Sequence, residues 1–444
     1  MKKLLLLVFS AALLAWLLAP QWRSFDAMGE RRFQALAHMP KEIVVGICWP
    51  FSINQDGMGD GLQLALEEIN AHKIAGGIPM RLVLRDDRDD WDRAKRIAIE
   101  FSETPEMSAV VGYYDDGKAI KASTMYESSR LLHIMVGVNA AHMTAHGLQY
   151  ILRTIVASDK IARALARISA ARGYKKFAMV WEREAFGEDL AYQFHVAMDA
   201  QGAQLVYQTS YDRDHDDFRL TVNQLKGVDA DFIFLSGLEP WAGDFVAMAT
   251  EVGLKTQIIG AFSDTPDMRA HAGPGIEGSM LVDFYDVNSP TPENQAFVAT
   301  FRHRFGRLPD TWAAQGYDAL RMLAGAVRAT GSANPLDLSY ALRYMDPYEG
   351  ANGRYKFDGQ GELEDKPIYL YVVRGNSSSV VQASPPPPPV TPDAPPPSER
   401  LPVPSLTPHA VPPSAPSPTP SLSPPSTASS TPTHTSALPP PPTP

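Results

Sequence analysis

The stretch VVGYYDDGKAIKAS, residues 110–123, has the pattern of a buried strand that passes through a tight turn into a helix. Two carboxylates, Asp115 and Asp116, stand at that turn. A helix N-terminus offers free N–H groups and the positive end of the helix dipole, so an acid there either caps the helix or faces a ligand that is not a simple anion. Both interpretations hold together if one acid caps and the other faces the ligand.

The same alternation of strand and helix extends outward from this turn. Apolar runs typical of buried strands occur at 42–49, 80–87 and 132–138, and the segment GDGLQLALEEINAH (59–72) has helical spacing. Such alternation predicts a parallel sheet that is covered on both faces.

A second round of alternation begins at about residue 160, with the helix DKIARALARISAARGY and then the strand KKFAMVWE. The fold class predicted is therefore α/β, with two Rossmann-like lobes whose parallel sheets are joined by a hinge. Lobe 1 is expected over about 42–155 and lobe 2 over about 156–285, with a ligand crevice at the carboxyl ends of the strands. Two helices are predicted late in the chain, and the missing strands of lobe 1 are expected to return from that region.

The two ends of the chain differ from this core. Residues 1–22 contain two lysines followed by an apolar run from Leu4 to Ala19, which predicts an export signal and a periplasmic location. The run is short for a spanning helix and no A-x-A follows it, so a cleaved signal peptide and a retained anchor tethering the protein to the inner membrane both stay open. Of the 39 prolines, 25 fall within 385–444, a composition typical of a disordered spacer, a partner-binding tail or an inert tail.

Composition and motifs exclude several classes of function. The net charge is −10 without basic clusters, which argues against nucleic acid as a partner. Cys48, the only cysteine, is expected in the core. Phosphate-loop, nucleophile-elbow and dinucleotide motifs are missing, so neither an enzyme nor a cofactor is predicted.

Two clusters invite a metal hypothesis. The acids in RDDRDDWD (85–92) have the ligand type for a divalent cation, but a helix N-cap at Asp89 or Asp90 is the favoured interpretation. His142 and His146 share a helical spacing without the acid that H-E-x-x-H requires, so no metal site is predicted.

Several segments in order resemble the type I periplasmic binding proteins, and within them the branched-chain amino acid binding family of ABC transporter solute-binding proteins. The resemblance covers residues 42–375, the predicted binding domain. It is carried by GDGLQLALEEINAHKIAGGIPMRLVLRDD, VVGYYDDGKAIKASTMYES, LQYILRTIVASD, FGEDLAYQF, DADFIFLSG, EVGLKTQIIG and GSMLVDFY.

The resemblance implies a set of ligand contacts and one departure from them. In that family a Ser and a Thr after the third and fourth strands hold the ligand's carboxylate, and Asp116 and Asn139 fall near those positions. An Asp there repels a carboxylate, so the turn at Asp115 and Asp116 suits a cationic or amine group better.

The other site residues implied by the resemblance are aromatic or acidic. Asp264 is expected to replace the family acid that holds an amino group, and Arg153 is expected to form a structural ion pair at the hinge. Because Tyr113 and Tyr114 alternate, one is expected to line the crevice while the other packs inward. The remaining candidates around the crevice are Trp49, Tyr113, Phe186, Glu239 and Trp241.

The function predicted is therefore that of an exported, non-enzymatic solute-binding protein. It is expected to close on a small polar, amino-acid-like or amine-bearing ligand and, if it resembles its family, to deliver it to an ABC permease. Two alternatives stay open: a membrane-tethered sensor that signals to a partner, and a non-binding envelope scaffold that uses the Pro-rich tail.

Overall fold

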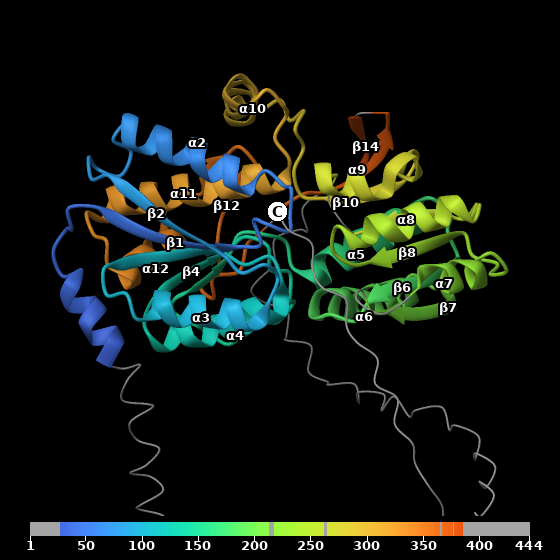
Figure 1. Cartoon of the computed structure of the whole chain (residues 1–444), viewed down its shortest axis with the longest axis horizontal. Coiled ribbons are helices and arrows are strands. Elements are labelled where there is room, and N and C mark those ends of the chain that lie inside the picture. The colour runs from blue at the N-terminus through green and yellow to red at the C-terminus, as the bar shows by residue number, and fades with distance from the viewer. Residues whose placement is uncertain (1–26, 213–216, 262–263, 365, 376, 385–444) are drawn as a thin grey trace, which may run out of the picture. The chain divides into compact units, whose positions relative to one another are not determined.

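The computed structural model describes residues 27–212, 217–261, 264–364, 366–375 and 377–384, and all of them belong to one compact unit (Figure 1). The predicted export signal and the predicted tail at 385–444 lie outside the described residues. Within the described ranges, no helix is long and apolar enough to cross a membrane.

The first lobe is built on a parallel sheet with the strand order β2-β1-β3-β4-β5 among the described residues. Its strands are β1 (Ile43–Trp49), β2 (Met80–Asp86), β3 (Met107–Gly112), β4 (Leu132–Met135) and β5 (Ile151–Arg153). Alternate side chains enter different cores, since Val45 and Ile47 pack in one cluster and Val44 and Cys48 in another. The sheet is therefore buried on both faces, as a nearly continuous apolar sequence requires.

Helices from both ends of the sequence cover this sheet (Figure 1). One face carries α2 (Met58–Ala71), α11 (Thr311–Thr330) and α12 (Pro335–Tyr344), and the other carries α3 (Trp91–Ser102) and α4 (Asp116–Ser128). Helices α2 and α11 approach closely at Gly61, where an added Cβ would lie 2.0 Å from the carbonyl oxygen of Ala313. Only glycine fits that crossing.

The second lobe has a larger sheet with the order β14-β13-β10-β9-β8-β6-β7 among the described residues. Its strands are β6 (Lys176–Glu182), β7 (Gln204–Tyr211), β8 (Phe232–Ser236), β9 (Gln257–Gly260), β10 (Met280–Asp283), β13 (Ile368–Arg374) and β14 (Ser377–Ser384). The first five are parallel, whereas β13 and β14 pair in the antiparallel direction.

Alternate side chains along the strands of the second sheet pack in two different hydrophobic clusters. Phe177 and Phe232 pack in the cluster that includes α5 (Ser158–Ala171) and α6 (Ala185–Asp199), while Val180 and Ile233 pack in the other. The second cluster includes α7 (Phe218–Leu225), α8 (Trp241–Glu251), α9 (Pro266–Ala272) and the short 3-10 turn η1 (Gly273–Ile276). The two-lobe α/β fold predicted from the sequence is confirmed.

The expected late return to lobe 1 is made by helices, and the prediction of late strands there was wrong. Helices α11 and α12 pack on the first sheet, but β13 and β14 join the second. Leu370 on β13 is buried opposite Val282 of β10, so the edge of the second sheet supplies both apolar contacts and strand hydrogen bonds to the late strand. Between the late helices and strands lie the α10 helix (Pro292–Phe305) and the hairpin of β11 (Tyr348–Gly350) and β12 (Gly353–Tyr355).

Within the described residues the chain crosses between the lobes three times, at 154–157, at 284–291, and at 356–364 with 366–367. Arg153, which is fully buried, donates from Nε to Glu362 at 2.9 Å and also pairs with it through Nη2. Its Nη1 donates to the carbonyl of Ala140. The guanidinium thus ties the first crossing to the third, and the ion pair expected for Arg153 is present.

We predict that Arg153→Ala lowers the free energy of unfolding by about 3 kcal/mol, because it leaves the Glu362 carboxylate and the Ala140 carbonyl without their buried partner. Arg163→Ala is the control, since Arg163 pairs with Asp159 on an exposed helix face and should cost under about 1 kcal/mol. Urea denaturation of the fragment 27–384 measures both. Equal losses in the two variants would contradict a special role for Arg153.

Candidate ligand-binding site

The turn after β3 sends two adjacent tyrosines in opposite directions. Gly112 has φ of 145° and Tyr113 has φ of 62°, a conformation that is rare for a bulky residue. Tyr113 is buried in the core beneath α4, and its hydroxyl lies 2.8 Å from that of Tyr126. Tyr114 enters the opposite core and reaches the cavity. The alternation expected from sequence therefore assigns the cavity position to Tyr114.

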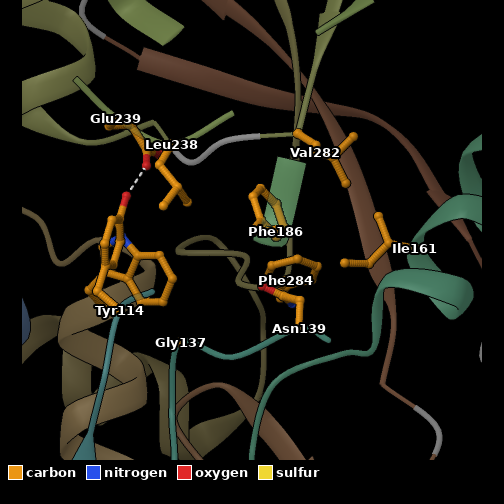
Figure 2. Close-up of a pocket in the computed structure, with 11 residues that line it drawn as sticks. Tyr114, Gly137, Asn139, Ile161, Phe186, Leu238, Glu239, Val282 and Phe284 are labelled. Atoms are coloured by element: carbon orange, nitrogen blue, oxygen red, sulfur yellow. Dashed lines mark hydrogen bonds between the residues drawn. The ribbon is translucent and has the colours of Figure 1, made fainter. Parts of the chain in front are cut away.

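A small cavity of about 30 Å³ lies where turns from both sheets meet (Figure 2). Most of its wall is apolar or aromatic. The lining residues are Tyr114, Gly137, Asn139, Ile161, Phe186, Leu238, Glu239, Ala261, Val282, Phe284 and Trp312. This volume is enough for about two water molecules, so a larger solute requires the lobes to separate or a side chain to move.

One hydrogen bond spans the cavity from lobe to lobe. The hydroxyl of Tyr114, which follows β3, donates to Oε2 of Glu239, which follows β8 (Figure 2). Burial, and then the Glu239 carboxylate, raise the pKa of Tyr114 well above its usual value. Tyr114 therefore stays protonated and remains the donor.

Trp49 forms part of the support behind the cavity. Its ring packs edge-on against Tyr114 at 5.2 Å and lies 5.3 Å from Trp312, centroid to centroid. Its Nε1 donates to Asp56 at 2.9 Å. Burial, and then the charge of Asp310, raise the pKa of Asp56 to about 8.

Asp115 and Asp116, in the turn after β3, have different hydrogen-bonding roles. Asp115 caps α4 by accepting from the N–H of Lys118 at 2.8 Å, and it also pairs with the Lys118 ammonium at 3.4 Å. Asp116 accepts from the N–H of Asn139 at 2.8 Å, so it ties the turn after β3 to the turn after β4. Burial raises the pKa of Asp116 to about 7. Neither acid is among the residues that line the cavity.

Asn139 lines the cavity, but its polar groups hold the hinge. Its Nδ2 donates to the Val156 carbonyl at 2.6 Å, and its backbone carbonyl accepts from the N–H and Oγ of Ser158. A donor already used in this way is a poor anchor for a ligand carboxylate.

Acidic side chains of the second lobe surround the same region. Asp283, at the end of β10, accepts from Thr311 and from the N–H of Phe284. Burial raises the pKa of Asp283 to about 7, with smaller contributions from the charges of Glu239 and Asp264. Asp264 forms an ion pair with Arg269 at 2.6 Å, and Trp241 begins α8; neither lines the cavity.

The structure thus brings Asn139, Phe186 and Glu239 of the predicted set to the cavity wall, with Trp49 and Asp116 close behind it. Their roles in binding stay predictions. The apolar wall went unpredicted, although Val282 and Phe284 lie in the quoted segment GSMLVDFY. The residues around Trp312 did not predict its place in the cavity. It lies on α11, which comes late in the sequence and packs back on the first sheet.

The metal hypotheses gain no support. Asp90 caps α3 by accepting from the N–H of Arg93 at 2.8 Å, as the favoured interpretation predicted. Within the described part of the chain, no group of three His, Cys, Asp or Glu side chains is arranged to hold a metal ion. Cys48 is fully buried, with Sγ 3.7 Å from Asp87.

Comparison with known proteins agrees with this geometry. The model of the periplasmic binding protein family matches residues 50–378. The chain belongs to the periplasmic binding protein family. This periplasmic binding protein is a non-enzymatic solute-binding protein, and the resemblance stated from its sequence is confirmed.

Its relatives have a range of described ligands. A Leu/Ile/Val-binding protein homolog 2 of Brucella abortus is 25% identical over 340 residues, covering 75% of this chain and 91% of the relative. An ABC transporter substrate-binding protein of Desulfitobacterium hafniense, solved with Leu, is 27% identical with a TM-score of 0.68, covering 77% of this chain and all of that one. A solute-binding protein of Rhodopseudomonas palustris, solved with benzoate, has a TM-score of 0.71 at 22% identity, covering 78% and 97%. The last likeness concerns the fold alone.

Tyr114→Phe should lower the free energy of unfolding by about 1–3 kcal/mol, because the buried Glu239 carboxylate loses a hydroxyl donor. Tyr192→Phe on α6 is the matched control; that side chain is 60% exposed and should give a change within about 0.5 kcal/mol. Urea titration of the fragment 27–384 compares them. No loss in Tyr114→Phe would mean that the bond across the cavity does not stabilise this closed arrangement.

The raised pKa of Asp116 predicts a pH dependence of stability. Between about pH 4 and 7 the folded state keeps a proton that the unfolded chain releases, so stability falls as pH rises through this window. Asp116→Asn keeps the oxygen that accepts from Asn139 and removes the ionisation. We expect the variant to melt higher than the native fragment at pH 8 and at the same temperature near pH 4.

The matched control for this pH series is Asp115→Asn, which removes the ion pair with Lys118 and should melt lower at pH 8. Thermal unfolding at pH 4 to 8 gives both comparisons. If Asp116→Asn also melted lower at pH 8, its carboxylate would be stabilised in the charged form, contrary to the effect expected from burial.

Proposed function

We propose that the protein captures a small amine-bearing solute between its lobes and delivers it to an ABC importer in the inner membrane. One observation carries the choice of ligand: the only carboxylate on the cavity wall is Glu239, and no Lys, Arg, Ser or Thr stands among the described residues that line it. A cationic amine would pair with that carboxylate, whereas a ligand carboxylate would meet only neutral donors there, which are the Tyr114 hydroxyl, the Asn139 amide and the Trp312 indole N–H.

The aromatic wall supports the same choice. Tyr114, Phe186, Phe284 and Trp312 present four rings around a space that also contains the Glu239 carboxylate. Ring faces attract cations, and the attraction grows when water is excluded. Asp283 lies next to the lining residues Val282 and Phe284, and because burial raises its pKa to about 7, it adds negative charge only as pH rises through that value.

Binding is expected to exchange one interaction for another. In the structure the Tyr114 hydroxyl donates a hydrogen bond to the Glu239 carboxylate from the opposite lobe. An ammonium group that reached Glu239 when the lobes were open would take the place of that hydroxyl, and the lobes would close on the ligand instead. The importer is supported by the family and by relatives described as ABC transporter substrate-binding proteins.

The small cavity favours one other function. A volume of about 30 Å³ holds no amino acid, which is the arrangement expected of an envelope scaffold whose lobes pack permanently against each other. Such a scaffold would depend on the Pro-rich segment for its partners and would not respond to small solutes.

A thermal-shift screen of the fragment 27–384 tests the proposal with primary amines, polyamines, neutral amino acids, short carboxylates and benzoate. A ligand at a hundred times its Kd should stabilise the fold by about 2.7 kcal/mol. We expect the amines to shift the melting temperature and the simple carboxylates not to.

Glu239→Gln should weaken amine binding at least about tenfold by calorimetry, since it removes the charge that pairs with the ammonium group. Glu251→Gln is the control, because Glu251 pairs with Arg219 on the exposed end of α8, and its Kd should equal the native value. A shift with carboxylates alone would reject the amine ligand. No shift with any compound would favour the scaffold.

A further inference from the structure

A helix at residues 27–35 precedes the part of the chain that matches the family, and it is fixed to the first lobe. Met28 on this helix and Leu36 directly after it are buried against the lobe. Gly29 lies against Arg130 just after α4, where an added Cβ would approach the arginine side chain to 2.7 Å. The helix is therefore packed as part of the lobe.

Arg32 provides the strongest attachment of this helix. It is 1% exposed, and its Nη2 donates to the carbonyls of Phe101, Ser102 and Thr104 at 3.2, 2.8 and 3.1 Å, while Nη1 donates to Ser129. These carbonyls lie at the C-terminal ends of α3 and α4. A buried cation at two helix C-termini satisfies the free carbonyls and the negative ends of both dipoles.

Burial lowers the pKa of Arg32 to about 10, so the side chain keeps its charge at neutral pH. The outer face of the same helix is different in character. Phe33 is 49% exposed, and Met39 just beyond the helix is 37% exposed. Glu30, Arg31 and Gln34 are exposed on the same helix, so its outer face combines charged groups with an aromatic ring, as in helices that lie in the headgroup region of a bilayer.

The sequence before the helix contains the apolar run of the predicted export signal. The apolar run 4–19 is separated from residue 27 by only seven residues, 20–26, which span at most about 25 Å when fully extended. Pro20 directly follows the run, and the A-x-A motif of a signal-peptide cleavage site does not stand at its end. If the run stays in a membrane, the helix lies close to the lipid surface.

We propose that the helix at 27–35 couples the first lobe rigidly to a lipid bilayer, with residues 4–19 retained as the anchor. Arg32 fixes the helix to α3 and α4, so the first lobe keeps one face toward the membrane. The second lobe is therefore the one that moves when the cleft opens. This proposal is independent of the ligand.

Retention of the anchor is tested on the full chain, exported from a Gram-negative host with a C-terminal tag. We expect the purified protein to begin at residue 1 or 2 and to stay in the membrane pellet after a carbonate wash. A matched chain with residues 1–19 replaced by a cleavable signal peptide should be soluble. A native chain that is soluble and begins after residue 19 would overturn the proposal.

The coupling is tested by fluorescence energy transfer in vesicles of phosphatidylethanolamine and phosphatidylglycerol with acceptor dyes on the headgroups. Cys48 is fully buried, so Phe33→Cys and Leu220→Cys each add one accessible thiol. Leu220 is 68% exposed on α7, which packs on the second sheet. We expect the dye at position 33 to transfer at least twice as efficiently as the dye at position 220, and equal efficiencies would contradict the coupling.

Arg32→Met in the Phe33→Cys chain should reduce the transfer advantage of position 33, because the helix loses the donor to four carbonyl groups of the first lobe. The comparison between positions 33 and 220 stands in the native background even if this variant fails to fold. Unchanged transfer in a folded Arg32→Met chain would show that Arg32 does not provide the coupling.

Discussion

The buried guanidinium of Arg153 is the interaction on which the arrangement of the cleft depends. It joins the first crossing between the lobes to Glu362 in the third, and it also binds the carbonyl of Ala140 in the turn after β4. The backbone repeats the connection, since the N–H of Arg153 donates to the carbonyl of Gly361 at 3.0 Å. Fixing these segments together also fixes Asn139, whose carbonyl accepts from Ser158 at the start of α5. The turns that form the cavity are thus positioned by the hinge itself.

Burial of acidic groups gives the cleft its chemical character. Asp56, Asp116 and Asp283 all have pKa values raised chiefly by burial, to about 8, 7 and 7, so each keeps its proton to a higher pH than an exposed aspartate does. Glu239 is held by a hydroxyl from the opposite lobe. Of these four acids, only Glu239 is among the described residues that line the cavity.

Much of the fold could be predicted because its signals are local. The apolar run at 42–49 and the helical spacing at 59–72 predicted β1 and α2 almost to the residue, and the acids at 89–90 predicted the cap of α3. The same local reasoning explains the cap of α4, because the Asp115 side chain accepts from the N–H of Lys118, only three residues later. It failed for β13 and β14, because the sheet that a late strand joins depends on where the third crossing leads the chain.

The sequence by itself determined the two-lobe α/β fold, the family and the turns from which the cleft is built, since periodicity and turn chemistry act over a few residues. Only the tertiary structure decided which side chains meet there. The left-handed conformation of Tyr113 turned that ring into the core and gave the cavity to Tyr114. Trp312 and Glu239 joined it from segments about 200 and 125 residues away in sequence. Contacts over such separations depend on how the sheets and crossings pack, and no short pattern of residues records them.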